Sequence, residues 1–267
     1  MGDVDVATHM VFVALGVAVA ALVVLAETRR LDLDRDAMLV AVTGALVGGG
    51  IGMRLSGWLR HLDPGDNPSL ALAWQYGAKS ILGGLAGAYV GVLVAKRLGG
   101  YTVRTGDAFA PAVALGMAVG RIGCHLAEAP GRVTSLPWGV HAPATVPQCP
   151  GCVAGAAMHP SFLYEIGFHL VAFVLLMRVR RARHRPGELL TLYLAAYAVF
   201  RFAVEFVRAN EVVALSLTRP QWFLLLVGPM VIARVLLGWR RGWYIGVPDA
   251  LVRRARPWRA TTVGQTR

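Results

Sequence analysis

The chain has 267 residues, of which 56% are hydrophobic and only 16% are charged, and its formal net charge is +12. This composition is unusual for a soluble domain and typical of a polytopic membrane protein. Most basic residues lie in short segments between apolar runs, so we attribute the positive charge to membrane topology and expect no nucleic-acid partner.

Seven apolar runs are each long enough to cross a bilayer as a helix, which takes about 20 residues. They cover residues 8–26, 37–57, 75–95, 105–127, 161–178, 187–207 and 220–238. We therefore expect an all-α, polytopic membrane domain over residues 1–238, with a loop at 128–160, followed by a basic tail at 239–267. Ser161 is the expected N-cap of the fifth span.

Lys and Arg concentrate on one side of the predicted membrane. They are Arg29, Arg30 and Arg35; Lys96, Arg97 and Arg104; the segment 178–185; and Arg240, Arg241, Arg253, Arg254, Arg256, Arg259 and Arg267. The positive-inside rule makes this side cytoplasmic, with the N-terminus and the 128–160 loop outside and the C-terminus inside. The tail then serves as an orientation signal that contacts anionic lipids.

Charged residues interrupt five of the spans at a similar depth. They are Arg54, Lys79, Arg121, Glu165 and Arg201. With a rise of 1.5 Å per helical residue, all five fall in the outer third of the predicted membrane. In the sixth span Tyr197, Arg201, Glu205 and Arg208 are spaced four, four and three residues apart, which predicts one stripe on a helix.

Two interpretations fit this charged set. Single basic side chains can extend outward to the lipid headgroups. Together with two carboxylates, the same residues indicate a polar chamber within the bundle, open toward the outer leaflet. A cationic excess attracts an anion, and the planar guanidinium group suits phosphate. We therefore expect Arg121, whose insertion costs about 2.5–3.5 kcal/mol, to bind a lipid phosphate.

Five stretches carry a resemblance to a known family. They read "GRIGCHLAEAPGR" (120–132), "LPWGV" (136–140), "HPSFLYE" (159–165), "YAVFRFAVEFVR" (197–208) and "TRPQWFLLLVGPM" (218–230). In order and spacing they resemble the prolipoprotein diacylglyceryl transferases, whose usual forms are Gly-Arg-x-Gly-Asn-Phe, His-Pro-Ser-x-Leu-Tyr-Glu and Tyr-x-x-x-Arg-Phe-x-x-Glu-Phe-x-Arg. The seven-span topology with the N-terminus outside also matches that family.

The resemblance implies a reaction of lipoprotein biosynthesis in the bacterial plasma membrane, at a site facing the outer leaflet. The diacylglyceryl group of phosphatidylglycerol would pass to the lipobox cysteine of a prolipoprotein signal peptide, and glycerol phosphate would leave. Both substrates are therefore the expected partners, and neither a cofactor nor a metal is expected.

Roles follow from the matching positions. Arg121 and Arg201 would hold the phosphate, Glu165 and Glu205 would orient these arginines, and Tyr197 would line the site. Gly131 would shape the turn after the first motif. Arg54, Arg208, His159 and Cys124 complete the candidate substrate-binding residues.

Several positions depart from the family pattern. Cys124 and His125 replace the usual Asn and Phe, and His9 aligns with a usual Tyr. The segment before Gly131 is one residue short, so Glu128 has no clear counterpart. Most important, Leu82 occupies the position of a usual His, a candidate base for the acceptor thiol.

Lys79, one helical turn before Leu82, is either a substitute base or one more phosphate ligand. Because leucine cannot move a proton, two other functions stay open. One is a lipid transferase with another acceptor, and the other is a phospholipid-binding protein without catalytic activity. A small-solute transporter fits poorly, since neither repeat symmetry nor a broken span is evident.

The remaining cysteines form "CPGC" (149–152) in the 128–160 loop. A disulfide between Cys149 and Cys152 suits an oxidising exterior. A zinc site of these cysteines with His125, His141 or His159 and a redox role are the alternatives. We expect the disulfide.

Overall fold

The computed structural model describes residues 3–58, 80–128, 130–141 and 155–248. Within these ranges the chain forms seven long helices: α1 Asp3–Arg30, α2 Arg35–Trp58, α4 Ile81–Leu98, α5 Gly106–Ala127, α6 Ser161–Val179, α7 Glu188–Val204 and α8 Arg219–Arg240. Each is long and apolar enough to cross a membrane, α7 together with the 3-10 helix η2 Glu205–Val207. The seven predicted spans and the all-helical class are therefore confirmed.

Some predicted features fall outside the described residues. They are the start of the third span at 75, Lys79, Cys149 and Cys152 in the 128–160 loop, and the tail from 249 onward. Two small hairpins were not predicted. In one, β1 Val140–His141 pairs with β2 Ala157–Met158, and in the other β3 Val212–Ala214 pairs with β4 Leu217–Thr218.

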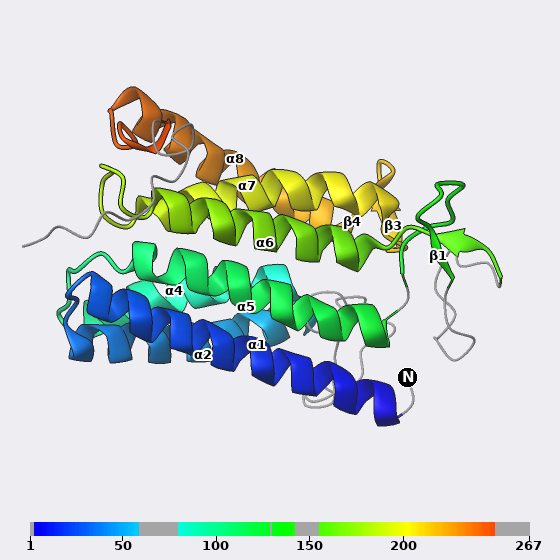
Figure 1. Ribbon diagram of the computed structural model, residues 1–267, viewed down its shortest axis with the longest axis horizontal. Coiled ribbons are helices and arrows are strands. Elements are labelled where there is room, and N and C mark those ends of the chain that lie inside the picture. The colour runs from blue at the N-terminus through cyan, green and yellow to red at the C-terminus, as the bar shows by residue number, and fades with distance from the viewer. Residues whose placement is uncertain (1–2, 59–79, 129, 142–154, 249–267) are drawn as a thin grey trace, which may run out of the picture.

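The helices lie side by side in two groups, with α1, α2, α4 and α5 in one and α6, α7 and α8 in the other (Figure 1). Helix α5 joins the groups, since it contacts α1, α6 and α7. The start of α1, both hairpins and the ends of α5 and α7 lie at one end of the bundle, which we call the hairpin end. The α1–α2, α4–α5 and α6–α7 connections lie at the opposite end. In these connections or next to them are Arg29, Arg30, Arg35, Lys96, Arg97, Arg104 and the arginines of segment 178–185.

Glycines let α2 approach α4 closely, and they do the same for α1 and α5. A Cβ at Gly48 of α2 would overlap the carbonyl oxygen of Gly87 and lie 2.7 Å from the Gly91 Cα atom of α4. In α1, a Cβ at Gly16 would lie 2.7 Å from the Gly116 carbonyl oxygen of α5. Small residues serve this purpose in membranes, where the lipid tails are as apolar as the helix surfaces and van der Waals packing drives association.

The predicted N-cap of α6 is wrong by one residue. Pro160 holds the cap position, with φ −75° and ψ 64°, and no side chain caps the helix. The Ser161 amide donates to the His159 carbonyl at 2.8 Å, which makes an inverse γ-turn. Ser161 is therefore already the first helical residue, because the turn places the helix directly after the proline.

We expect Gly48→Ala to destabilise the protein by about 1–3 kcal/mol, because its methyl group overpacks the α2–α4 contact. Gly50→Ala is the matched control, since a Cβ there meets nothing within 4 Å outside its own helix. Alanine at such an unconstrained position favours the helix by about 0.5–1 kcal/mol. Unfolding in the same detergent compares the two variants, and equal stabilities would contradict the close α2–α4 packing.

Candidate active site

The charged residues of the predicted stripe meet those of α5 and α6 at the hairpin end of the bundle. Arg121 lies near the end of α5, Glu165 in the second turn of α6, and Tyr197 and Arg201 in the last turns of α7. All four side chains are buried. Because α5 and α7 arrive at this end and α6 departs from it, the three helices bring their charges together (Figure 1).

Glu165 is the shared partner of two arginines. It forms an ion pair with Arg121, and its Oε1 atom accepts a hydrogen bond from Arg208 Nη1 at 2.8 Å. The Tyr197 hydroxyl lies 3.4 Å from both Arg121 Nη2 and Glu165 Oε2. The carboxylate therefore links α5, α6 and the segment after α7.

Glu205 organises the second half of the cluster. It forms an ion pair with Arg201, and its Oε2 atom lies 3.9 Å from Arg208 Nε. Its other oxygen accepts hydrogen bonds from Asn210 Nδ2 at 2.5 Å and from Thr218 Oγ1 at 2.8 Å. Thr218 is also the N-cap of α8, so this carboxylate connects the end of α7 to the start of α8.

The predicted stripe ends earlier than its spacing suggests. Helix α7 stops at Val204, Glu205 begins the 3-10 turn η2, and Arg208 is extended at φ −80° and ψ 149°. Because the chain turns there, Arg208 reaches back across to Glu165 instead of continuing up the helix face.

The cluster carries an excess positive charge. Arg121, Arg201 and Arg208 contribute three guanidinium groups against two carboxylates. The ring of Phe162 lies beneath two of them, with its centroid 4.5 Å from the Arg208 Cζ atom and 6.0 Å from that of Arg121. Since burying an uncompensated charge is costly, the arrangement favours an anionic ligand.

Gly131 lies where three segments meet. Its amide donates to the His159 carbonyl at 2.6 Å, and the Arg132 amide donates to the Val207 carbonyl at 2.8 Å. A Cβ at Gly131 would overlap the Val207 carbonyl oxygen and lie 2.9 Å from the His159 Cβ atom. Only glycine fits this approach, which fastens the segment after α5 to the start of α6 and the end of η2.

His159 lies beside the cluster in a loop network. Its Nδ1 atom is 3.3 Å from the Tyr164 hydroxyl, which also accepts a hydrogen bond from Trp138 Nε1 at 2.9 Å.

Arg54, another candidate residue from the sequence, is half-buried on α2. In the described part of the chain, the carboxylates of the cluster pair with arginines 121, 201 and 208.

An apolar cavity of about 350 Å³ adjoins the cluster between α4, α7 and α8. Tyr197 belongs to both, since its hydroxyl contacts Glu165 and its side chain lines the cavity. Leu82 and Phe223 line the same cavity. The position of Leu82 therefore faces apolar surroundings beside the cluster.

Sequence reasoning missed two groups of site residues. His169 is fully buried, its Nδ1 atom lies 3.0 Å from the Tyr193 hydroxyl, and its ring centroid is 4.8 Å from that of Tyr197. His169 follows Glu165 by four residues and Tyr193 precedes Tyr197 by four, so helical periodicity was an available signal. Asn210 and Thr218 follow the helix end, where no such period applies.

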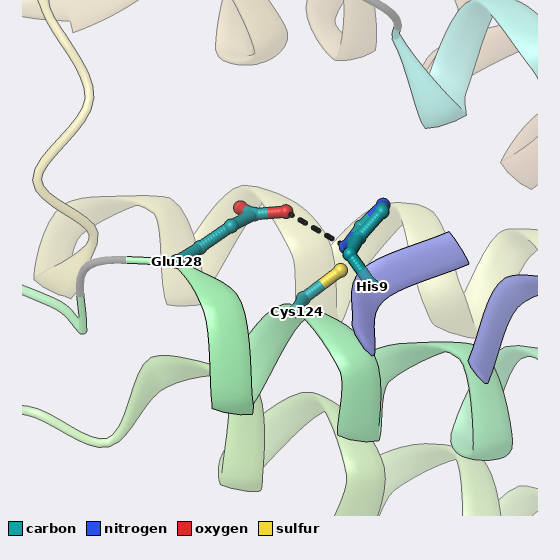
Figure 2. Close-up of side chains that lie close together, drawn as sticks. All are labelled: His9, Cys124 and Glu128. Carbon is teal, nitrogen blue, oxygen red and sulfur yellow. Dashed lines mark ion pairs between the residues drawn. The ribbon is translucent and has the colours of Figure 1, made fainter. Parts of the chain in front are cut away.

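A third group joins α1 and α5. Metal-binding atoms of His9, Cys124 and Glu128 all lie within 4.8 Å of one another (Figure 2). It is the one group of this kind among the residues that the structure describes. Cys124 also faces the arginine cluster, since its buried Sγ atom lies 3.9 Å from Arg121 Nη1.

Within the described residues, seven helices are long and apolar enough to span a membrane, with a buried cluster of arginines at one end and an apolar cavity beside it, as in a polytopic membrane protein. A model of the family "Prolipoprotein diacylglyceryl transferase" matches residues 1–239. The phosphatidylglycerol–prolipoprotein diacylglyceryl transferase of Bacillus cereus is 30% identical over 244 residues, 88% of this chain and 84% of the relative. The enzyme of that name from Bordetella bronchiseptica is 35% identical over 212 residues, 76% of this chain and 75% of the relative.

The chain therefore belongs to the prolipoprotein diacylglyceryl transferase family. It is a membrane transferase of lipoprotein biosynthesis, as its sequence motifs predict.

Glu165→Gln keeps the side-chain shape but removes the charge that Arg121 and Arg208 share. We expect a loss of about 3–5 kcal/mol in unfolding free energy, because two buried guanidinium groups lose their counter-ion. The control is Glu211→Gln, which breaks an exposed ion pair with Arg219 at 2.9 Å and is expected to cost about 0–1 kcal/mol. Unfolding in mixed micelles measures both, and similar losses would contradict a structural role of Glu165.

Proposed function

We propose that the protein transfers the diacylglyceryl group of phosphatidylglycerol to the lipobox cysteine thiol of a prolipoprotein. The observation that carries this proposal is a buried cluster of net positive charge that shares Tyr197 with an apolar cavity. A phospholipid offers the matching combination of an anionic phosphate and long apolar chains. Donor and acceptor are those in the names of the similar enzymes from B. cereus and B. bronchiseptica.

Phosphate binding falls to the guanidinium groups. Arg121 and Arg201 hold the phosphate oxygens, with Arg208 and Arg54 as further cationic contacts. Glu165 and Glu205 orient the arginines through the ion pairs described above. The acyl chains enter the apolar cavity past Tyr197.

The chemical step is a displacement at carbon. The acceptor thiolate attacks C3 of the diacylglyceryl group, and a sulfur–carbon bond forms. The bond between that carbon and the phosphate oxygen breaks, and its electron pair leaves with glycerol phosphate. Arg121 and Arg201 stabilise the charge that grows on the departing phosphate. Before the attack the thiol proton passes to a base, either Lys79, the candidate from the sequence, or water.

Three further residues, Gly131, His159 and Cys124, lie beside the proposed reaction site. Gly131 and His159 fasten the segment after α5 to the start of α6 beside the cluster, through the hydrogen bond from the Gly131 amide to the His159 carbonyl. Cys124 lies next to Arg121, the arginine assigned to the phosphate, with its Sγ atom 3.9 Å from Arg121 Nη1. Lys79, the candidate base from sequence, lies outside the described residues.

The proposed location is the plasma membrane of a bacterium, with the N-terminus outside, the C-terminus in the cytoplasm and the site toward the outer leaflet. The basic connections gather at the end of the bundle opposite the cluster, which supports a cytoplasmic position for that end. The cluster at the hairpin end then faces the leaflet that exported prolipoproteins reach.

Leu82 favours a second candidate function, because an apolar residue lines the cavity at the position of the usual His. Without that proton acceptor, the chain would be a transferase for another acceptor or a phospholipid-binding protein without activity. Both alternatives keep the phosphate-binding arginines.

The test is mass spectrometry of a lipobox peptide incubated with purified protein and phosphatidylglycerol. We expect a diacylglyceryl mass on the peptide cysteine, and a rate about 10²–10³-fold lower for folded Arg121→Gln, because a donor to the developing charge is lost. Arg219→Gln, with an exposed arginine at the start of α8, is the matched control and should react like the wild type.

Other outcomes decide between the candidates. Phosphatidylglycerol that is consumed while the peptide stays unmodified would point to another acceptor. Tightly bound phosphatidylglycerol with neither consumption nor product would contradict the transferase reaction and favour a lipid-binding protein.

A further inference from the structure

Two helices place a sulfur, a nitrogen and an oxygen donor together beside the arginine cluster. Cys124 and Glu128 are four residues apart at the end of α5, and the Glu128 amide donates to the Cys124 carbonyl at 2.8 Å. Both side chains therefore leave the same helix face. Figure 2 shows them directed toward His9, which projects from α1.

The close contact of α1 with α5 brings His9 to this place. A Cβ at Gly123 would lie 3.1 Å from the His9 carbonyl oxygen and 2.8 Å from the Phe12 Cβ atom. Because Gly123 has no side chain, the backbone of α1 reaches α5 one residue before Cys124. The position of the imidazole thus follows from backbone packing and does not depend on a flexible loop.

His9 Nδ1 is buried and has no hydrogen-bond partner in the described part of the chain. It lies 3.7 Å from Glu128 Oε1, a contact that is an ion pair if the imidazole is protonated but is too long for a hydrogen bond (Figure 2). Two ligands of a tetrahedral zinc ion, each about 2.0–2.3 Å from the metal, lie about 3.3–3.8 Å apart. The 3.7 Å between His9 Nδ1 and Glu128 Oε1 therefore fits two ligands of a shared metal ion.

The donor set selects the kind of metal. Thiolate, imidazole and carboxylate are the three zinc ligands that proteins use, whereas magnesium and calcium take oxygen ligands. Three protein ligands leave one tetrahedral position open, the arrangement of catalytic rather than structural zinc sites. The side chains of His9 and Glu128 are 26% and 37% exposed, which provides a route to that position.

We propose that His9, Cys124 and Glu128 bind a zinc ion whose open position takes the acceptor thiol as a thiolate. The choice of thiol as the fourth ligand rests on the proposed function. Coordination to zinc removes the proton of a thiol, and that proton passes to water. Glu165 and Glu205 are held in ion pairs with arginines, so the metal supplies a deprotonation for which these carboxylates are not free.

The location suits this role. Cys124 Sγ lies 3.9 Å from Arg121 Nη1, so the metal site borders the arginine assigned to the phosphate. A thiolate on the ion would stand next to the leaving group of the donor lipid. The ion itself takes no part in bond breaking.

The first experiment measures metal without either substrate. In a Cys149→Ser/Cys152→Ser background, Cys124 is the single thiol of the chain. Protein purified in detergent and dialysed against dilute zinc is analysed by inductively coupled plasma mass spectrometry. We expect one zinc ion per chain, lost on Cys124→Ala or His9→Ala and kept on His125→Ala, the neighbouring histidine of α5 outside the group. Zinc content that is independent of Cys124 and His9, or no bound zinc, would overturn the site.

The second experiment replaces zinc by cobalt, whose thiolate complexes absorb in the near ultraviolet. We expect this absorption to depend on Cys124 and to increase when a lipobox peptide is added, but not when its cysteine is replaced by serine. No increase with the cysteine peptide would overturn the thiol as fourth ligand. Because no phospholipid is present, a failed transfer reaction and a failed metal site give separate results.

Discussion

The carboxylate of Glu165 receives two guanidinium groups from different parts of the chain, Arg121 in α5 and Arg208 beyond α7. A fully buried carboxylate stays ionised only with such partners, and each arginine needs the same carboxylate in return. These three side chains thus fix how α5, α6 and the end of α7 are arranged at the hairpin end. Glu205 connects α7 to α8 in a similar way, because it forms an ion pair with Arg201 and accepts a hydrogen bond from Thr218.

The ion pairs that hold this end of the bundle together also form the proposed site. Among the described residues of the cluster, three arginines stand against two carboxylates, and Tyr197 also lines the adjacent apolar cavity. Stability and function are therefore coupled here, and a substitution in the cluster has to be judged by its folding as well as by its activity. The control variants at Glu211 and Arg219 separate the two effects because their ion pair is exposed.

The sequence predicts the spans and the shared depth of the buried charges, because hydropathy and the fixed rise of a helix determine both. It also predicts which residue types gather, since Arg121, Glu165, Tyr197 and Arg201 all lie in the cluster. The partner of Arg208 could not be predicted, because it depends on the helix ending at Val204 and turning through η2.

The group of His9, Cys124 and Glu128 escaped the sequence analysis for a related reason. Its members come from helices far apart in the chain, and they meet only because glycines let α1 lie directly against α5. The sequence pattern directed attention to Cys149 and Cys152 instead, since closely spaced cysteines are the visible signal. Long-range grouping of this kind requires the helix packing to be known first.

The central claim is that the arginine cluster binds the phosphate of a phospholipid. Native mass spectrometry of the protein with phosphatidylglycerol, or with diacylglycerol carrying the same acyl chains, tests it most directly. We predict that the wild type retains phosphatidylglycerol and not diacylglycerol, and that folded Arg201→Gln binds the phospholipid about 10- to 100-fold more weakly, because charge-assisted hydrogen bonds are lost. Equal retention of both lipids, or unchanged binding by the variant, would contradict the claim.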